Sequence, residues 1–153
     1  MNVKILHITK MKGISGSENH LFTLLSGLHK QHFTVELCIL VEQVHVELLQ
    51  EIKQTLALQG VTVSMLIIPK YGSIQLILKL RNYIIQERFD IVHTHLIHAD
   101  IYGTLAAKLA KVPVILSSRH NDDRFRRHIL LIWLNRLLAH WHTNVIVISD
   151  WVG

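Results

Sequence analysis

Strand-like apolar runs alternate with amphipathic helical patterns along the whole of this 153-residue chain. The runs predict strands over residues 3–8, 33–41, 61–68, 90–93, 112–116 and 145–148. Apolar residues at helical spacing lie between them, over 18–29, 46–56, 74–85, 102–109 and 126–141. Such alternation is typical of an α/β fold. It predicts a doubly wound, mostly parallel, Rossmann-like sheet of about six strands in the order 3-2-1-4-5-6.

Local signals add detail to this outline. Ser73 is a suitable N-cap for the helix over 74–85, and Gly60 is a suitable stop for the helix before it. On the buried side of the 74–85 helix we expect Ile74, Ile77, Leu78, Ile84 and Ile85. The helix over 102–109 is expected to bury Tyr102, Leu105, Ala106 and Leu109.

The composition indicates one packed globular domain spanning residues 1–153, because half of the residues are hydrophobic and only 18% are charged. Cys38, the single cysteine, lies in an apolar strand, which predicts a reduced core thiol. The chain begins without a secretory pattern, and its longest apolar run is too short for a membrane span, so we expect a cytoplasmic protein.

The formal net charge of +5 favours an anionic partner. The basic residues are scattered, however, and do not alternate with aromatic residues as they do in many RNA-binding sheets. We therefore expect no nucleic acid partner and favour a small phosphorylated ligand.

Three polar clusters, at residues 13–20, 93–100 and 117–123, follow the first, fourth and fifth predicted strands. In the predicted strand order these three strands are neighbours. Ligands of open parallel sheets bind outside the carboxyl ends of the strands. The clusters are therefore expected to form a single site.

The first cluster carries small residues at the start of a helix. Gly13 and Gly16 would let backbone N–H groups approach a phosphate, which the helix dipole also favours. The segment has neither the Walker lysine nor the GxGxxG spacing. The alternative is an ordinary strand-to-helix turn capped by Ser17, and both interpretations stay open.

The second cluster contains residue types that bind zinc or iron. His93, His95 and Asp100 would serve a metal-dependent hydrolase, but their order does not match the HxHxDH motif, so we expect no metal. At its strand position His93 would simply be buried and hydrogen-bonded. In the third cluster, Arg119, His120 and Asn121 offer an anion clamp, a proton-transfer group and an amide. The alternative there is a polar loop in which Asp123 caps the next helix.

Taken in order, six segments resemble the N-terminal domain of family 4 glycosyltransferases. They are residues 4–9, 16–21, 90–95, 112–115, 118–122 and 145–149. These enzymes are retaining transferases built from two Rossmann-like domains, the GT-B architecture. The resemblance implies that the chain is the N-terminal half of a GT-B fold, on the acceptor side of the active site.

The resemblance also implies roles for individual residues. Ser15 and Gly16 stand where the family usually has two glycines that approach the donor phosphates. His120 corresponds to the histidine beside the transferred sugar and is the implied catalytic residue. The implied acceptor-binding residues are His95, His98, Asp100, Arg119 and Asn121. A nucleotide diphosphate sugar would be the co-substrate and a hydroxyl compound the acceptor, with no other cofactor.

In the family, most of the residues that bind the nucleotide-sugar donor, and a pair of glutamates, belong to a C-terminal domain that residues 1–153 do not contain. The resemblance thus implies half an active site, inactive alone. A non-catalytic sugar- or nucleotide-binding module is the alternative. The helix over 126–141 has a broad apolar face with arginines at one end, which suits either core packing, the favoured interpretation, or peripheral contact with the inner membrane face.

Overall fold

The computed structural model describes residues 2–14, 16–69, 72–119, 136 and 138–147. Within them, parallel strands form one sheet in the order β3-β2-β1-β4-β5-β6, which confirms the predicted topology. The strands are β1 (Lys4–Met11), β2 (Thr34–Val41), β3 (Thr62–Ile67), β4 (Ile91–His95), β5 (Val114–Arg119) and β6 (Asn144–Val147).

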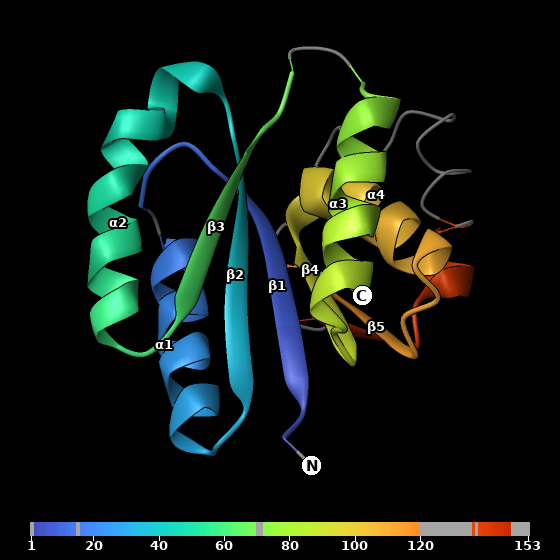
Figure 1. The fold of residues 1–153 in the computed structure, drawn as a ribbon, viewed down its shortest axis with the longest axis horizontal. Coiled ribbons are helices and arrows are strands. Elements are labelled where there is room, and N and C mark those ends of the chain that lie inside the picture. Colours follow the sequence, from blue (N-terminus) through green and yellow to red (C-terminus); the bar gives the residue numbers. More distant parts are fainter. Residues whose placement is uncertain (1, 15, 70–71, 120–135, 137, 148–153) are drawn as a thin grey trace.

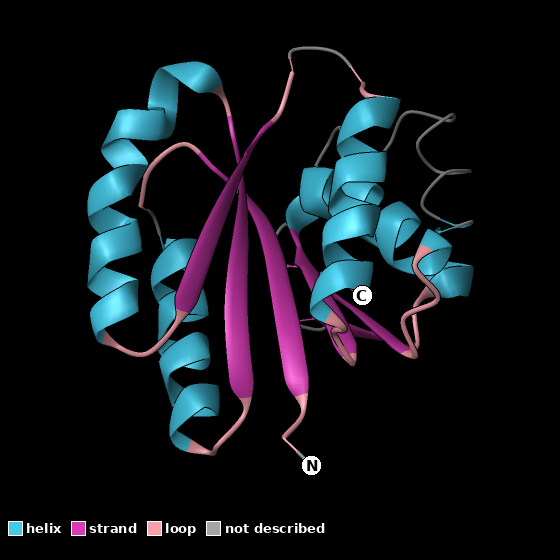
Figure 2. Ribbon diagram, in the orientation of Figure 1, coloured by secondary structure: helices cyan, strands magenta, loops and turns pink. Residues whose placement is uncertain are grey.

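Helices cover both faces of the sheet. They are α1 (Gly16–Lys30), the 3₁₀ helix η1 (Gln43–His45), α2 (Val46–Leu58), α3 (Ile74–Glu87) and α4 (Leu96–Leu109). Helices α1 and α2 lie on one side of the strands and α3 and α4 on the other (Figures 1 and 2). The prediction for the helix over 126–141, including its membrane option, falls almost entirely outside the described residues.

The helix ends follow local chemistry. The Ser73 hydroxyl accepts a hydrogen bond from the Leu76 amide at 3.2 Å, so Ser73 is the N-cap of α3 as predicted. Gly60 follows α2 with a φ of 80°, a conformation that glycine adopts without strain. The interpretation of Ser17 as a cap is wrong, because α1 already begins at Gly16 and the Ser17 hydroxyl donates to Glu18.

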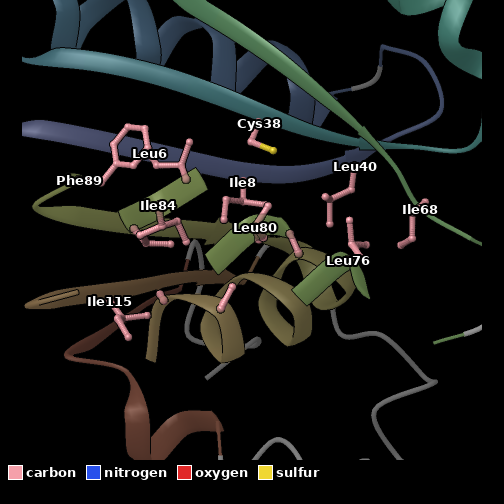
Figure 3. Packing of buried hydrophobic residues seen from close by; sticks show 14 residues of the cluster. Leu6, Ile8, Cys38, Leu40, Ile68, Leu76, Leu80, Ile84, Phe89 and Ile115 are labelled. Atoms are coloured by element: carbon pink, nitrogen blue, oxygen red, sulfur yellow. The ribbon is translucent and has the colours of Figure 1, made fainter. Parts of the chain in front are cut away.

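The core between the sheet and helices α3 and α4 contains even-numbered residues of β1, β2 and β4 together with Ile115 of β5 (Figure 3). Leu6 and Ile8 of β1 and Leu40 of β2 are fully buried there. Cys38 lies among them, and burial raises the pKa of its thiol to about 12. The thiol is therefore protonated and unreactive at neutral pH, which agrees with the predicted core role.

The faces that helices α3 and α4 turn to the sheet agree only in part with those predicted. Ile84 and Ala106 are buried as expected, and Ile77 and Tyr102 pack against the core. Helix α3 buries Leu76, Leu80 and Ile84, while Ile74, Leu78 and Ile85 are exposed. Helix α4 buries small residues, among them Ala99, Gly103, Ala106 and Ala107, and its Leu109 is exposed. Both helices carry apolar residues on more than one face, so spacing alone did not identify the buried stripe. Helix α4 packs close to the strands, so only small side chains fit at the contact.

The contact of Gly103 with the sheet predicts a stability effect. A β-carbon added there would lie 2.6 Å from Thr94 Cγ2 and 3.0 Å from Ile8 Cδ1. Overpacking costs about 1–3 kcal/mol, and alanine returns at most about 1 kcal/mol of helix propensity. Gly103→Ala should therefore lower the free energy of unfolding by up to about 2 kcal/mol in urea titrations.

Gly27 of α1 is the matched control, because a β-carbon added there meets no atom within 4 Å. Gly27→Ala should raise the free energy of unfolding by roughly 0.5–1 kcal/mol. Equal effects of the two substitutions would contradict close packing at Gly103.

Candidate functional site at the carboxyl edge of the sheet

The carboxyl ends of β1, β4 and β5 lie side by side, as the sequence predicts for one site. In the sheet register Thr9 of β1 pairs with His95 of β4, and His95 pairs with Ser118 of β5. Polar segments that are about 80 and 100 residues apart in the chain are thereby brought together.

The segment between β1 and α1 has open space around its glycines. A β-carbon added at Gly13 or Gly16 would meet no atom within 4 Å, so neither glycine is required by internal packing. Gly16 begins α1, where backbone amides have no helical partner and favour an anion. Its predicted companion, Ser15, lies outside the described residues.

Two pockets border this segment. One, of about 510 Å³, is mostly apolar and is lined by Gly13, Ile14, Asn19, Phe22, Leu48, Glu51, Ile52, Thr55, Leu56 and Gln59. The other, of about 440 Å³, shares Gly13 and Ile14 and adds Lys10, Lys12 and Glu18. Where the two pockets meet, apolar surface therefore lies beside the charged side chains of Lys10, Lys12 and Glu18.

Glu42 offsets much of the positive charge at the second pocket. Its carboxylate lies 2.8 Å from Lys10 Nζ and 3.8 Å from Lys12 Nζ, and the hydrogen bond and charge of Lys10 lower the pKa of Glu42. The sequence pattern did not single out these lysines, although two lysines at the end of a buried strand were a visible signal.

A cluster of three histidines lies just below this edge, on the α1 side of the sheet. His7 Nδ1 is 3.0 Å from His95 Nε2, and His93 Nε2 is 2.7 Å from Ser118 Oγ. All three rings are buried. The prediction that His93 is buried and hydrogen-bonded is confirmed, whereas His7 was missed because it lies within an apolar strand.

Burial lowers the pKa of His7 well below its ordinary value, and His93 lowers it further. Below about pH 6.5 the His7 imidazole therefore takes up a proton in the unfolded chain, whereas in the folded chain it stays neutral. The contribution of His7 to the free energy of unfolding should be constant above about pH 6.5 and should fall by up to about 1.4 kcal/mol per pH unit below it. Urea titrations across pH test this. His7→Gln should flatten the slope, and an unchanged slope would contradict the assignment.

Asp100 lies on the opposite face, within a separate buried network. Its Oδ1 accepts from the Thr94 hydroxyl at 2.9 Å and the Thr104 hydroxyl at 3.3 Å, and lies 3.0 Å from His142 Nε2. Burial alone raises the pKa of Asp100, but the hydrogen bond and charge of His142, with help from Thr94, bring it below its ordinary value. The hydrolase ligand set of His93, His95 and Asp100 is therefore wrong: among the described residues, His7 joins the two histidines and Asp100 does not.

The remaining site predictions have the following positions. His95 is buried at the end of β4, and His98 is half-buried in the first turn of α4. Arg119 is the last residue of β5, whereas His120 and Asn121 lie outside the described residues. The catalytic, phosphate-binding and acceptor-binding roles stay predictions.

A doubly wound parallel sheet in this strand order defines a Rossmann-like domain. The model of Glycosyltransferase Family 4 matches residues 14–153, so the chain belongs to this family. No curated protein sequence matches this chain.

Solved structures share the fold at low identity. Anabaena Alr3699/HepE, crystallised with UDP and glucose, is 15% identical with a TM-score of 0.66, over 94% of this chain and 37% of that one. Acinetobacter baumannii MurG is 15% identical with a TM-score of 0.64, over 99% and 42%. A putative UDP-N-acetylglucosamine 2-epimerase from Listeria monocytogenes is 13% identical with a TM-score of 0.69, over 98% and 40%.

The chain thus has the fold of the N-terminal half of a GT-B protein and spans about two fifths of the length of these structures. Within the part of the chain that the structure describes, no helix is long and apolar enough to cross a bilayer.

Proposed function

We propose that this chain is the acceptor-side domain of a retaining glycosyltransferase that moves a sugar from a nucleotide diphosphate sugar to a hydroxyl acceptor. The family match over residues 14–153 carries the proposal. The open carboxyl edge beside the β1–α1 segment supports it, because a two-domain transferase needs one such edge facing its partner domain.

The donor phosphates would approach the start of α1 at Ser15 and Gly16. The open space at Gly13 and Gly16 suits this role, since a side chain would stand between the ligand and the backbone amides. Fixed dipoles of this kind stabilise charge on a leaving diphosphate without reorganising during the reaction.

The acceptor would enter by the pockets around Ile14, with His120 beside the transferred sugar. The 510 Å³ pocket falls within the size range of small-molecule sites and provides apolar contact for an aglycone. His98, Arg119 and Asn121 would orient the hydroxyl group. We assign no cofactor besides the nucleotide sugar.

Most donor affinity would come from a second Rossmann-like domain, so residues 1–153 alone should not transfer sugar. Sequencing the gene beyond codon 153 is the first test. A second such domain bearing two glutamates is expected, and a stop codon with no companion reading frame beside it would overturn the two-domain assignment.

Nucleotide binding is the second test. The complete gene product should bind a nucleoside diphosphate in calorimetric titrations with UDP, GDP and ADP, and residues 1–153 alone should bind at least about tenfold more weakly. A folded, complete product that binds none of the three would refute the transferase proposal.

A further inference from the structure

We propose that His7, His93 and His95 form a binding site for one divalent transition-metal ion, with Zn²⁺ as the representative ion. One ring nitrogen from each histidine lies within 4.8 Å of the others. The proposal does not depend on the transferase assignment, and it departs from the sequence-based expectation of no metal because it adds His7.

The sheet itself holds the three rings together. His93 and His95 are two residues apart on β4 and therefore point to the same face, and His7 is the register partner of His93 on β1. Ring centroids are 4.2 Å apart for His93 and His95 and 4.9 Å apart for His7 and His93. A site built on paired strands is pre-organised, so small ring rotations suffice.

The nitrogen spacing suits a metal ion. Zinc–nitrogen bonds of about 2.0–2.1 Å place two nitrogens of a tetrahedral site about 3.4 Å apart. His7 Nδ1 and His95 Nε2 are already 3.0 Å apart. An ion between them would replace one shared proton and widen the pair by a few tenths of an ångström.

The surroundings of the histidines also fit. Metal ions bind neutral imidazole, and burial favours the neutral form of His7. Ser118 Oγ, 2.7 Å from His93 Nε2, fixes the orientation of that ring as outer-shell groups do at metal sites.

Space for a further ligand lies beside His95. A cavity of about 10 Å³, close to the size of one water molecule, is lined by His95, Thr9 and Glu18 among others. Glu18 is buried. Three nitrogen ligands with room for water or a carboxylate favour Zn²⁺, Co²⁺ or Ni²⁺ over Mg²⁺ or Ca²⁺, which prefer all-oxygen sites.

Titration of the chelator-treated protein with Zn²⁺ and with Co²⁺ tests the site. We expect one saturable equivalent, with visible absorption bands of low-coordinate Co²⁺ that Zn²⁺ displaces. His7→Gln, His93→Gln and His95→Gln should each weaken binding at least about tenfold. His140→Gln, which changes an exposed histidine, is the matched control and should bind like the wild type.

X-ray absorption of the Zn²⁺-loaded wild type keeps the test decisive if a variant fails to fold. About three imidazole scatterers near 2.0 Å are expected. Fewer than two imidazoles, no saturable equivalent, or equal affinity of folded His7→Gln and wild type would overturn the site.

Discussion

Replacing His120 with alanine is expected to lower sugar transfer by at least about 100-fold in the complete enzyme, a loss typical of a removed proton-transfer or charge-stabilising group. In the sequence, His120 comes directly after Arg119, the last residue of β5. The family resemblance implies that its imidazole would lie beside the transferred sugar. The kcat for release of nucleoside diphosphate in the presence of acceptor measures the effect.

His140→Ala is the control for this experiment, because His140 is an exposed histidine at the end of the helical segment before β6. It should leave kcat unchanged. Circular dichroism should show that both variants keep the fold. Wild-type turnover in folded His120→Ala would contradict the role assigned to His120.

Asp100→Ala is expected to lower the free energy of unfolding by about 3–5 kcal/mol, the usual cost of removing one partner from a buried charged network. The Asp100 carboxylate accepts hydrogen bonds from the Thr94 and Thr104 hydroxyls and contacts His142. The side chains of Asp100 and His142 are only 2% and 1% exposed, respectively. Urea titrations of the wild type and the variant measure this loss.

A double-mutant cycle with His142→Gln should give a coupling free energy of about 0.5–3 kcal/mol, since the two side chains share one contact. Kinetic measurements on a further variant, Asp100→Asn, separate the two roles open to Asp100. A residue that only holds α4 against the segment before β6 changes stability, whereas an acceptor-binding residue changes KM in Asp100→Asn. Unchanged stability in Asp100→Ala would contradict the network.

The strand order could be predicted from the sequence because buried parallel strands leave continuous apolar runs, and only a few connections between them are chirally allowed. Ser73 and Gly60 acted locally, so their roles were visible in the sequence. The predicted strand order was enough to place the polar clusters at one edge of the sheet.

Other features depend on packing that a linear pattern does not encode. His7 joins His93 only through the β1–β4 register, and a histidine within an apolar run carries no sign of its partners. Asp100 lies near His95 in sequence, yet the alternation of side chains along β4 places its partner Thr94 on the opposite face. The larger pocket near Ile14 depends on how α1 and α2 pack beside each other, which amphipathic spacing does not specify.

The central position of β1 has a consequence for synthesis on the ribosome. Its Lys4 amide bonds the Asp90 carboxylate 86 residues away, and β1 pairs with β4 along most of its length. A nascent chain that ends before Ile91 therefore displays β1 as an open strand edge, a form prone to pairing with other chains. The native sheet cannot be completed before this long-range pairing forms, and contacts so far apart in sequence generally slow folding.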